Sequence, residues 1–249
     1  MRPLQILVSR FGFIIKKRRP AIPRATGSAP LEIQPANLMR AIHGKDIYEA
    51  FDYLQHPFDP AGWGCESPAF ETLIKRVRPR FIIEVGTWKG GSALRMADLL
   101  KENDLAGTPI LCVDTWLGAL EFWADQTQPD RFLALECKHG YPSVYYRFLA
   151  NVCHAGHTAR ITPFPLPAAT AALWLLRTNL RADLIYIDGS HEEEDVYQDL
   201  LDYAPLVAPG GCLFGDDWAW TGVRDAVTRF SRESKRPIEH IADKWVLAF

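Results

Sequence analysis

Four acidic residues each follow directly on a short apolar run of the chain. They are Glu84, Asp114, Asp188 and Asp216. In sheets built from alternating strands and helices, ligands bind beyond the carboxyl ends of the strands. We therefore expect these four carboxylates to meet at one rim of a sheet and to form a ligand site there.

The first of these acids leads into a glycine-rich turn at residues 86–92. Glycine lets a backbone pass close to a ligand, where a side chain would collide. A loop that binds phosphate carries lysine or free amides, whereas Glu84 would repel a pyrophosphate. The turn therefore favours a ligand with hydroxyls or an ammonium group, such as S-adenosylmethionine. A tight turn without a ligand is the alternative.

Asp114 lies 30 residues after Glu84, at the end of the next expected strand. A carboxylate at this place commonly accepts hydrogen bonds from ribose hydroxyls. We expect Asp114 to hold a ribose. An aspartate that only caps a helix is the alternative.

Asp188, Asp216 and Asp217 form a second acidic group. Two carboxylates about 4 Å apart repel each other by roughly 4 kcal/mol at an effective dielectric constant near 20. A divalent cation removes this repulsion, and a set of oxygen ligands suits Mg²⁺, Ca²⁺ or Mn²⁺ better than Zn²⁺. The sequence thus predicts a metal site at these three residues, and a solvated acidic loop is the alternative.

His191 completes the segment Asp188-Gly189-Ser190-His191. Histidine titrates near neutral pH and can act as a general base. We take His191 and Asp188 as the candidate catalytic residues. A histidine that merely begins the next helix is the alternative.

The elements that position these residues alternate along the chain. This alternation predicts an α/β fold with a Rossmann-like, doubly wound, mostly parallel seven-stranded sheet and helices on both faces. Six of the strands are expected at 80–85, 109–114, 159–164, 183–188, 211–216 and 243–248. Helices are expected at 35–56, 67–77, 91–102, 142–154, 167–179, 192–207 and 221–232.

The charge distribution divides the chain into a basic tail and an acidic body. Residues 1–30 carry seven basic and no acidic residues, whereas the remainder carries 21 basic and 30 acidic residues. We expect a flexible tail at 1–34, an N-terminal helical cap at 35–66 and one domain at 67–249. An acidic body argues against nucleic acid as a partner. Contact of the basic tail with a membrane stays open.

Five scattered cysteines form neither a C-x-x-C pair nor a disulfide framework. This pattern indicates a reducing, cytoplasmic location. Residues 117–141 form a long connection for this position, and we expect them to supply a lid.

Four segments in order carry a resemblance to a known family. They are Ile83–Ser92, Val113–Trp116, Tyr186–His191, and Ala208–Gly211 with Gly215–Asp217. Together they resemble the class I S-adenosylmethionine-dependent methyltransferases. The resemblance is closest to the metal-dependent small-molecule O-methyltransferases, a branch with macrolide-sugar methyltransferases and cephalosporin-hydroxylase-like proteins, and it covers residues 66–249.

The resemblance implies a role for each matching residue. Residues 165–167 would approach the adenine, and Asp188, Asp216 and Asp217 would hold Mg²⁺. The implied S-adenosylmethionine-binding residues are Glu84, Gly86, Thr87, Gly90, Ser92, Asp114, Thr115 and Trp116. Two departures from the family pattern are Ser190, where macrolide-sugar relatives carry an acid, and the proline-rich loop at 163–167.

The resemblance also implies a reaction. A metal-bound hydroxyl of a small molecule, a sugar or an aromatic compound, would lose its proton to His191, to water or to another group. The oxygen would then attack the sulfonium methyl group. The tryptophans near the rim would contact the acceptor or pack in the core: Trp63, Trp116, Trp123, Trp218 and Trp220. Whether the chain forms a homo-oligomer stays open.

Two other functional classes compete with this interpretation. One is a metal-dependent enzyme on the same fold that does not use S-adenosylmethionine. The other is a non-catalytic interaction module, in which the rim acids would be dispensable. A nicotinamide dehydrogenase is disfavoured because the glycine spacing differs from G-x-G-x-x-G.

Overall fold

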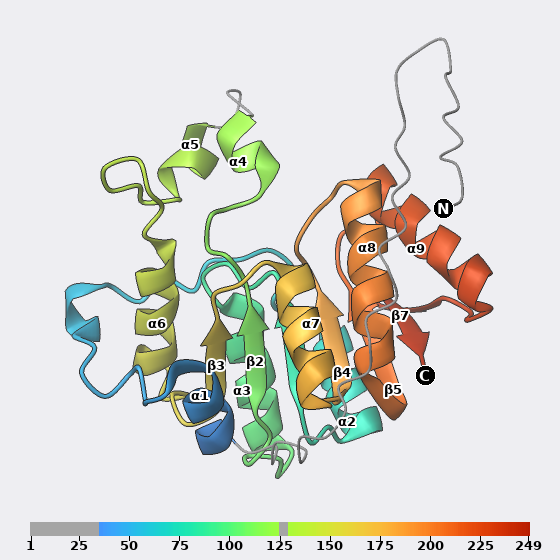
Figure 1. The fold of residues 1–249 in the computed structure, drawn as a ribbon, viewed down its shortest axis with the longest axis horizontal. Helices are drawn as coiled ribbons and strands as arrows, with labels where there is room; N and C mark the ends of the chain where they lie inside the picture. The colour runs from blue at the N-terminus through green and yellow to red at the C-terminus, as the bar shows by residue number, and fades with distance from the viewer. Residues whose placement is uncertain (1–34, 125–128) are drawn as a thin grey trace, which may run out of the picture.

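The computed structural model describes residues 35–124 and 129–249 (Figure 1). Within these ranges seven strands form one sheet in the order β3-β2-β1-β4-β5-β7-β6. β7 runs antiparallel to its neighbours β5 and β6, and the other pairs are parallel. This confirms the predicted sheet. The strands are β1 Ile82–Val85, β2 Ile110–Val113, β3 Ile161–Phe164, β4 Ala182–Ile187, β5 Val207–Gly215, β6 Glu239–Ile241 and β7 Lys244–Ala248.

The three central strands end level with one another. Val85 of β1 pairs with Val113 of β2 on one side and with Ile187 of β4 on the other. Asp114 and Asp188 are the next residues of β2 and β4, so both lie at the same edge of the sheet. The register thus brings segments far apart in the sequence to one rim, as the alternation of apolar runs and acids predicts.

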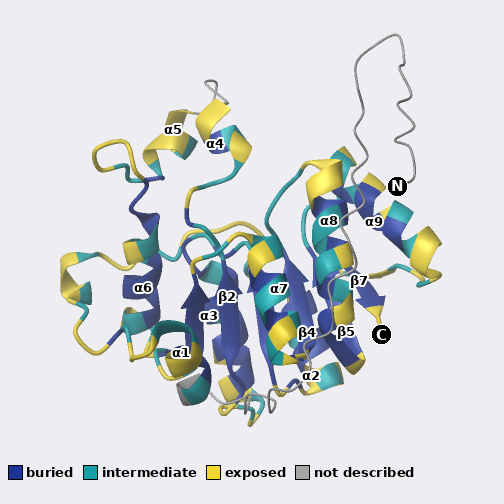
Figure 2. Cartoon of the chain, viewed as in Figure 1, coloured by how far each residue is buried: buried dark blue, intermediate teal, exposed yellow. Residues whose placement is uncertain are grey.

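Helices cover both faces of the sheet (Figure 1). α7, α8 and α9 pack on one face, and α2, α3 and α6 pack on the other. Figure 2 shows the strands buried between these two layers. The helices are α1 Pro35–His43, α2 Pro68–Val77, α3 Gly91–Glu102, α4 Leu120–Ala124, α5 Pro129–Leu133, α6 Val144–His154, α7 Ala168–Thr178, α8 Glu193–Tyr203 and α9 Thr221–Ser234, with 3₁₀ turns at Tyr53–Gln55 and Ala204–Leu206.

Side chains alternate between the two faces along β1. Ile83 and Val85 face the core under α7, α8 and α9, whereas Ile82 faces the core under α2 and α3. Glu84 therefore faces the α3 side, between apolar residues.

The predicted helix at 35–56 is wrong in length. α1 ends at His43 because Gly44 adopts φ +73°, a left-handed conformation that glycine takes without steric cost. The Gly44 amide closes this end by donating to the carbonyl of Arg40 at 2.9 Å. The segment 35–66 is therefore only partly helical, and the rest of it consists of turns, bends and irregular chain. The predicted tail at 1–34, with its open membrane contact, lies outside the described residues.

Two short helices and one strand were not located from the sequence. α4 and α5 lie in the connection that follows β2, beyond the carboxyl ends of the central strands (Figure 1). β6 is a three-residue strand, Glu239–Ile241, whose first two residues are exposed. Its polar sequence gives no apolar signal. None of the described helices is long and apolar enough to cross a bilayer.

Candidate active site

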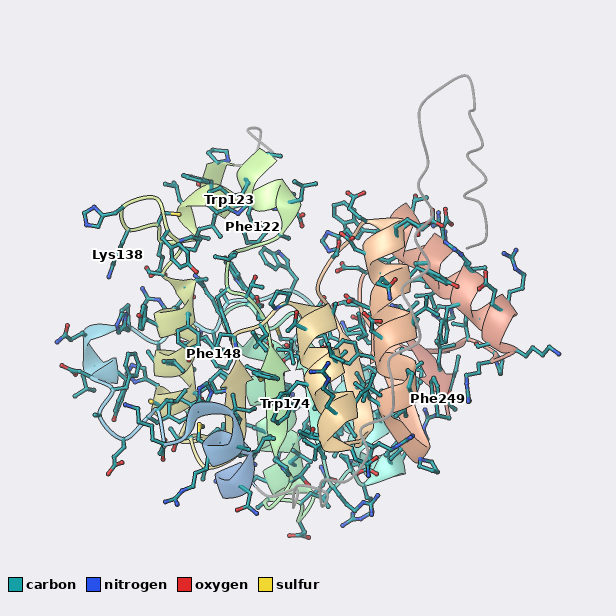
Figure 3. The ribbon with its side chains drawn as sticks, in the orientation of Figure 1. Phe122, Trp123, Lys138, Phe148, Trp174 and Phe249 are labelled. Atoms are coloured by element: carbon teal, nitrogen blue, oxygen red, sulfur yellow. The ribbon has the colours of Figure 1, made fainter. Side chains whose placement is uncertain are left out.

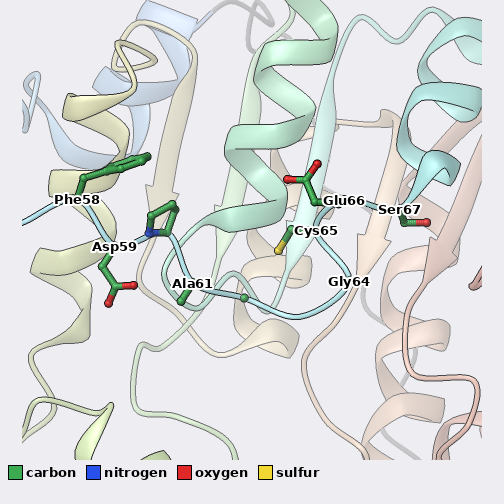
Figure 4. Close-up of a pocket in the computed structure, with 9 residues that line it drawn as sticks. Phe58, Asp59, Ala61, Gly64, Cys65, Glu66 and Ser67 are labelled. Atoms are coloured by element: carbon green, nitrogen blue, oxygen red, sulfur yellow. The ribbon is translucent and has the colours of Figure 1, made fainter.

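A cleft of about 710 Å³ lies at the carboxyl ends of the central strands. The glycine-rich turn and the first residues after β2 and β4 line it, as does Leu166 after β3. Aromatic side chains line it as well, including Trp63, Trp88 and Phe122. Phe122, labelled in Figure 3, belongs to α4, and its ring packs edge-on against Trp88 at 4.7 Å. A shallower hollow of about 550 Å³ lies along the loop 58–67 (Figure 4).

The glycine-rich turn crosses the end of β4 at close range. Gly86 has φ +83°, and a Cβ at this position would collide with the backbone carbonyl of Asp188. Only glycine combines this conformation with this contact. The amides of Thr87 and Trp88 donate to Asp114 Oδ2 at 2.8 and 2.9 Å. The turn is therefore tied to both neighbouring strands.

Asp114 lines the cleft and holds the turn in place. A further amide, that of Trp116, donates to Asp114 Oδ1 at 2.7 Å. Burial raises the pKa of Asp114, and hydrogen bonds from backbone amides oppose that rise by stabilising the carboxylate. A ligand hydroxyl would thus meet a carboxylate whose orientation is already set.

Glu84 lies beneath the turn and has no solvent-exposed surface. Its carboxyl accepts hydrogen bonds from Ser92 Oγ and, at 3.2 Å, from Thr87 Oγ1. Burial raises the pKa of Glu84 to about 8. Although we expected this side chain to meet a ligand ammonium at the rim, it does not line the cleft and holds the start of α3 against β1.

The predicted S-adenosylmethionine-binding residues divide into two groups. Gly86, Thr87, Ser92, Asp114 and Thr115 line the cleft. Glu84, Gly90 and Trp116 do not.

Gly90 and Trp116 support the site from behind. The indole of Trp116 is 2% exposed and donates from Nε1 to the Trp88 carbonyl at 2.8 Å. Its ring packs on Phe148 at 5.0 Å. A Cβ on Gly90 would lie 3.0 Å from the Phe148 ring. Both residues thus fix the turn against α6, where Figure 3 labels Phe148.

The carboxylates of Asp188 and Asp216 share one hydroxyl donor. Tyr186 Oη lies 3.1 Å from Asp188 Oδ2 and 3.5 Å from Asp216 Oδ2. Burial, and then the negative charges of Asp216 and Asp217, raise the pKa of Asp188 to about 7. The expected crowding of negative charge at this rim is present.

A lysine relieves part of this crowding. Lys244 Nζ, at the start of β7, lies 2.5 Å from Asp216 Oδ2. The other oxygen of Asp216 accepts from the Asp217 amide at 2.8 Å. Among the described residues no cluster of three or more acidic, histidine or cysteine side chains is arranged to hold a metal ion. The residues present do not fit the predicted Mg²⁺ at Asp188, Asp216 and Asp217.

His191 is the side chain best placed to move a proton. Its Nε2 lies 2.9 Å from Asp217 Oδ2, and its ring stacks on Trp220 at 4.3 Å and 14°. Because an ionised carboxylate only accepts hydrogen bonds, Nε2 carries the hydrogen. The hydrogen bond to Asp217 raises the pKa of His191, although burial opposes this.

The second ring nitrogen of His191 is left without a hydrogen bond. Nδ1 lies 3.0 Å from Glu121 Oε1, but the two groups are not oriented for hydrogen bonding. Glu121 belongs to α4 and lines the same cleft. Nδ1 is itself buried, and the Glu121 carboxylate beside it adds to the rise in the pKa of His191 by favouring a proton on the ring.

Sequence reasoning missed Lys244 and Glu121. The signal for Lys244 is a lone charge at the head of an apolar strand, Lys-Trp-Val-Leu-Ala. Glu121 gives no comparable signal, because its place depends on how α4 packs over the strand ends.

A protein-family model described as a methyltransferase domain matches residues 83–218. The chain is 28% identical over 167 residues to the 8-demethyl-8-(2,3-dimethoxy-alpha-L-rhamnosyl)-tetracenomycin-C 4'-O-methyltransferase of Streptomyces olivaceus, covering 63% of this chain. It is 28% identical over 165 residues to the uncharacterized protein y4gI of Sinorhizobium fredii, covering 65% of this chain. The chain spans 60% and 16% of the lengths of these two relatives.

Solved structures show the same fold. The calicheamicin methyltransferase CalS11 matches with a TM-score of 0.53 and 19% identity, covering 73% of this chain and 77% of that one. The O-methyltransferase NovP matches with a TM-score of 0.52 and 18% identity, covering 72% and 77%. The family match spans more than half of the sequence and contains the glycine-rich turn and the rim acids, so the chain belongs to the methyltransferase domain family.

Proposed function

We propose that the protein transfers a methyl group from S-adenosylmethionine to a hydroxyl of a small molecule. Membership of the methyltransferase domain family supports the reaction class. The relative from Streptomyces olivaceus, named as a 4'-O-methyltransferase of a rhamnosyl compound, supports a hydroxyl acceptor, for example on a sugar. The observation that carries the proposal is the His191–Asp217 pair, which lies in the same cleft as the glycine-rich turn.

The cleft offers a surface for each part of S-adenosylmethionine. Gly86, Thr87 and Ser92 would contact its amino-acid part, and Asp114 its ribose. Residues 166–169, which follow β3 and line the cleft, would contact the adenine. Bound there, S-adenosylmethionine supplies an electrophilic methyl group on a sulfonium centre.

The chain's own groups would prepare the acceptor. Asp217 holds the Nε2–H of His191, so a neutral ring would take the proton of the acceptor hydroxyl at Nδ1, where that hydroxyl would have to displace Glu121 from its place 3.0 Å away. The stack on Trp220 holds the imidazole ring in one plane. With the cofactor bound, the acceptor oxygen would take the methyl group as the carbon–sulfur bond breaks and the thioether product leaves, and His191 would then release its proton to solvent. The predicted Mg²⁺ is left out of this proposal because its three aspartates do not fit a metal ion.

Calorimetric titration with S-adenosylmethionine tests the first part of the proposal. We expect micromolar binding by the wild-type protein and by Glu102→Gln, which neutralises an exposed carboxyl at the end of α3. Asp114→Asn is expected to bind at least about 10-fold more weakly, because it loses a charge-assisted acceptor in the cleft. An absence of heat from folded wild-type protein would contradict the proposal.

A further inference from the structure

Lys244 is a fully buried cation in the carboxylate rim. Its side chain has no exposed surface, and Nζ lies 2.5 Å from Asp216 Oδ2 and 2.9 Å from Asp243 Oδ2. Nζ also lies over the rings of Phe70 at 5.6 Å and Tyr186 at 5.9 Å. An ammonium is buried in this way only where carboxylates and aromatic faces replace its water shell.

Asp216 has both carboxylate oxygens occupied. Oδ2 accepts from Lys244, and Oδ1 accepts from the Asp217 amide at 2.8 Å. The Asp216 carbonyl is held as well, because Trp245 Nε1 donates to it at 2.8 Å. The carboxylate is thus held by a partner on each oxygen, and a metal ion at Oδ2 would compete with the ammonium.

The loop 58–67 packs closely against this pair. Gly64 of this loop, labelled in Figure 4, has φ +63°. A Cβ at Gly64 would collide with the Asp216 carboxylate and lie 2.6 Å from Lys244 Nζ. The backbone of this loop therefore packs directly against one side of the ion pair, while Asp216 still lines the cleft.

Asp217, the third aspartate of the predicted metal set, is also engaged. Its Oδ2 lies 2.9 Å from His191 Nε2. Two of the three carboxylates thus have nitrogen partners from this chain.

We propose that the Lys244 ammonium takes the place of a divalent cation in this rim, so that the protein balances its carboxylates without a metal and transfers methyl groups in a metal-independent manner. The statement on metal binding stands by itself, and the statement on methyl transfer rests on the proposed function. Without a metal to acidify the acceptor hydroxyl, the reaction depends more on a base for its proton, and His191 lines the same cleft.

The first test is a Mn²⁺ titration of the wild-type protein, followed by electron paramagnetic resonance. Bound Mn²⁺ loses the sharp signal of the free ion. We expect the signal to stay that of free Mn²⁺ through the micromolar range, with or without S-adenosylmethionine. Uptake of one equivalent of Mn²⁺ per chain at micromolar concentration would overturn the proposal, whatever the catalytic activity.

The second test removes the ammonium with Lys244→Met, matched by Lys101→Met on the exposed end of α3. Lys244→Met leaves the Asp216 charge unpaired, so its unfolding temperature is expected to fall by several degrees and to recover in part with millimolar Mg²⁺. Lys101→Met should show neither effect. A Lys244→Met protein as stable as the wild type would contradict the proposal.

A double variant covers the case in which Lys244→Met does not fold. Lys244→Met/Asp216→Asn removes both charges, and it is expected to fold and to show no stabilisation by Mg²⁺. A double variant that still does not fold would overturn the proposal that Lys244 balances the charge of Asp216.

A third test addresses the reaction. We expect wild-type turnover in EDTA to equal turnover in Mg²⁺ within about twofold. A large loss in EDTA would overturn metal-independent transfer. A protein that binds neither S-adenosylmethionine nor Mn²⁺ would contradict the proposed function while leaving the charge-balance proposal intact.

Discussion

His191 and Asp217 form a hydrogen-bonded pair at the wall of the cleft, with 2.9 Å between Nε2 and Oδ2. Asp217 adopts φ +60°, a conformation that non-glycine residues rarely take, in the turn after β5. The carboxylate thereby determines which ring nitrogen keeps its lone pair. The same relationship is used wherever an aspartate fixes the tautomer of a catalytic histidine.

His191→Asn is expected to lower kcat by roughly 10²- to 10⁴-fold, the usual contribution of a general base. Affinity for S-adenosylmethionine should stay unchanged, because the imidazole acts on the acceptor. Steady-state kinetics and calorimetry measure the two effects separately. The control is His240→Asn, which changes an exposed histidine of β6. Equal activity of the two variants would exclude His191 as the base.

The pH dependence of kcat/KM should report the same pair. His191 accepts a proton only when it is neutral, and its hydrogen bond to Asp217 raises its pKa above the ordinary value of about 6.5. Activity should therefore rise with pH through an apparent pKa above that value. In Asp217→Asn the midpoint should move to lower pH, since the charge that stabilised imidazolium is gone. A pH profile that does not change in Asp217→Asn would contradict the effect of Asp217 on the pKa of His191.

Glu84 should make folding stability depend on pH. Its pKa is raised to about 8 in the folded protein, from an ordinary value near 4.3 in the unfolded chain. Between these values the folded state holds a proton that the unfolded state has released, so stability falls as the pH rises, by up to about 1.4 kcal/mol per pH unit.

Glu84→Gln should reduce this dependence, because glutamine stays neutral, while Asp188, whose pKa is raised to about 7, still contributes. Urea unfolding at mildly acidic and mildly basic pH gives the two slopes. Glu102→Gln, an exposed neutralisation, should keep the wild-type slope. If the unfolding free energy of Glu84→Gln depends on pH as that of the wild type does, the Glu84 carboxyl is not the source of this pH dependence.

Gly86→Ala should destabilise the protein and weaken binding of S-adenosylmethionine. The alanine would have to adopt φ +83°, and its Cβ would collide with the Asp188 backbone. We expect a loss of at least about 2 kcal/mol of unfolding free energy, more than the left-handed conformation alone costs. Gly107→Ala is the matched control, because no atom lies within 4 Å of a Cβ there. Chemical denaturation of both variants gives the comparison, and equal stability would contradict the close contact.

Much of the fold could be predicted from local patterns. The apolar runs that become β1, β2 and β4 are buried on both faces, and acids or glycine stop them where the sheet meets the cleft. α3 begins and ends where the turn glycines and the periodicity indicate, at Gly91 and Glu102. α2 begins after Ser67, whose hydroxyl accepts from the Ala69 amide. These features depend on neighbours within a few residues, which the sequence displays.

The partners of the rim acids depend on residues far apart in the chain, and only the tertiary structure decided them. The sequence alone determined that Asp188, Asp216 and Asp217 follow strand ends. It took the packing of β7 against β5 to bring Lys244 to Asp216, and the packing of α3 on β1 to turn Glu84 inward. Burial makes such long-range contacts decisive, because a charge removed from water keeps only the partners that the fold supplies.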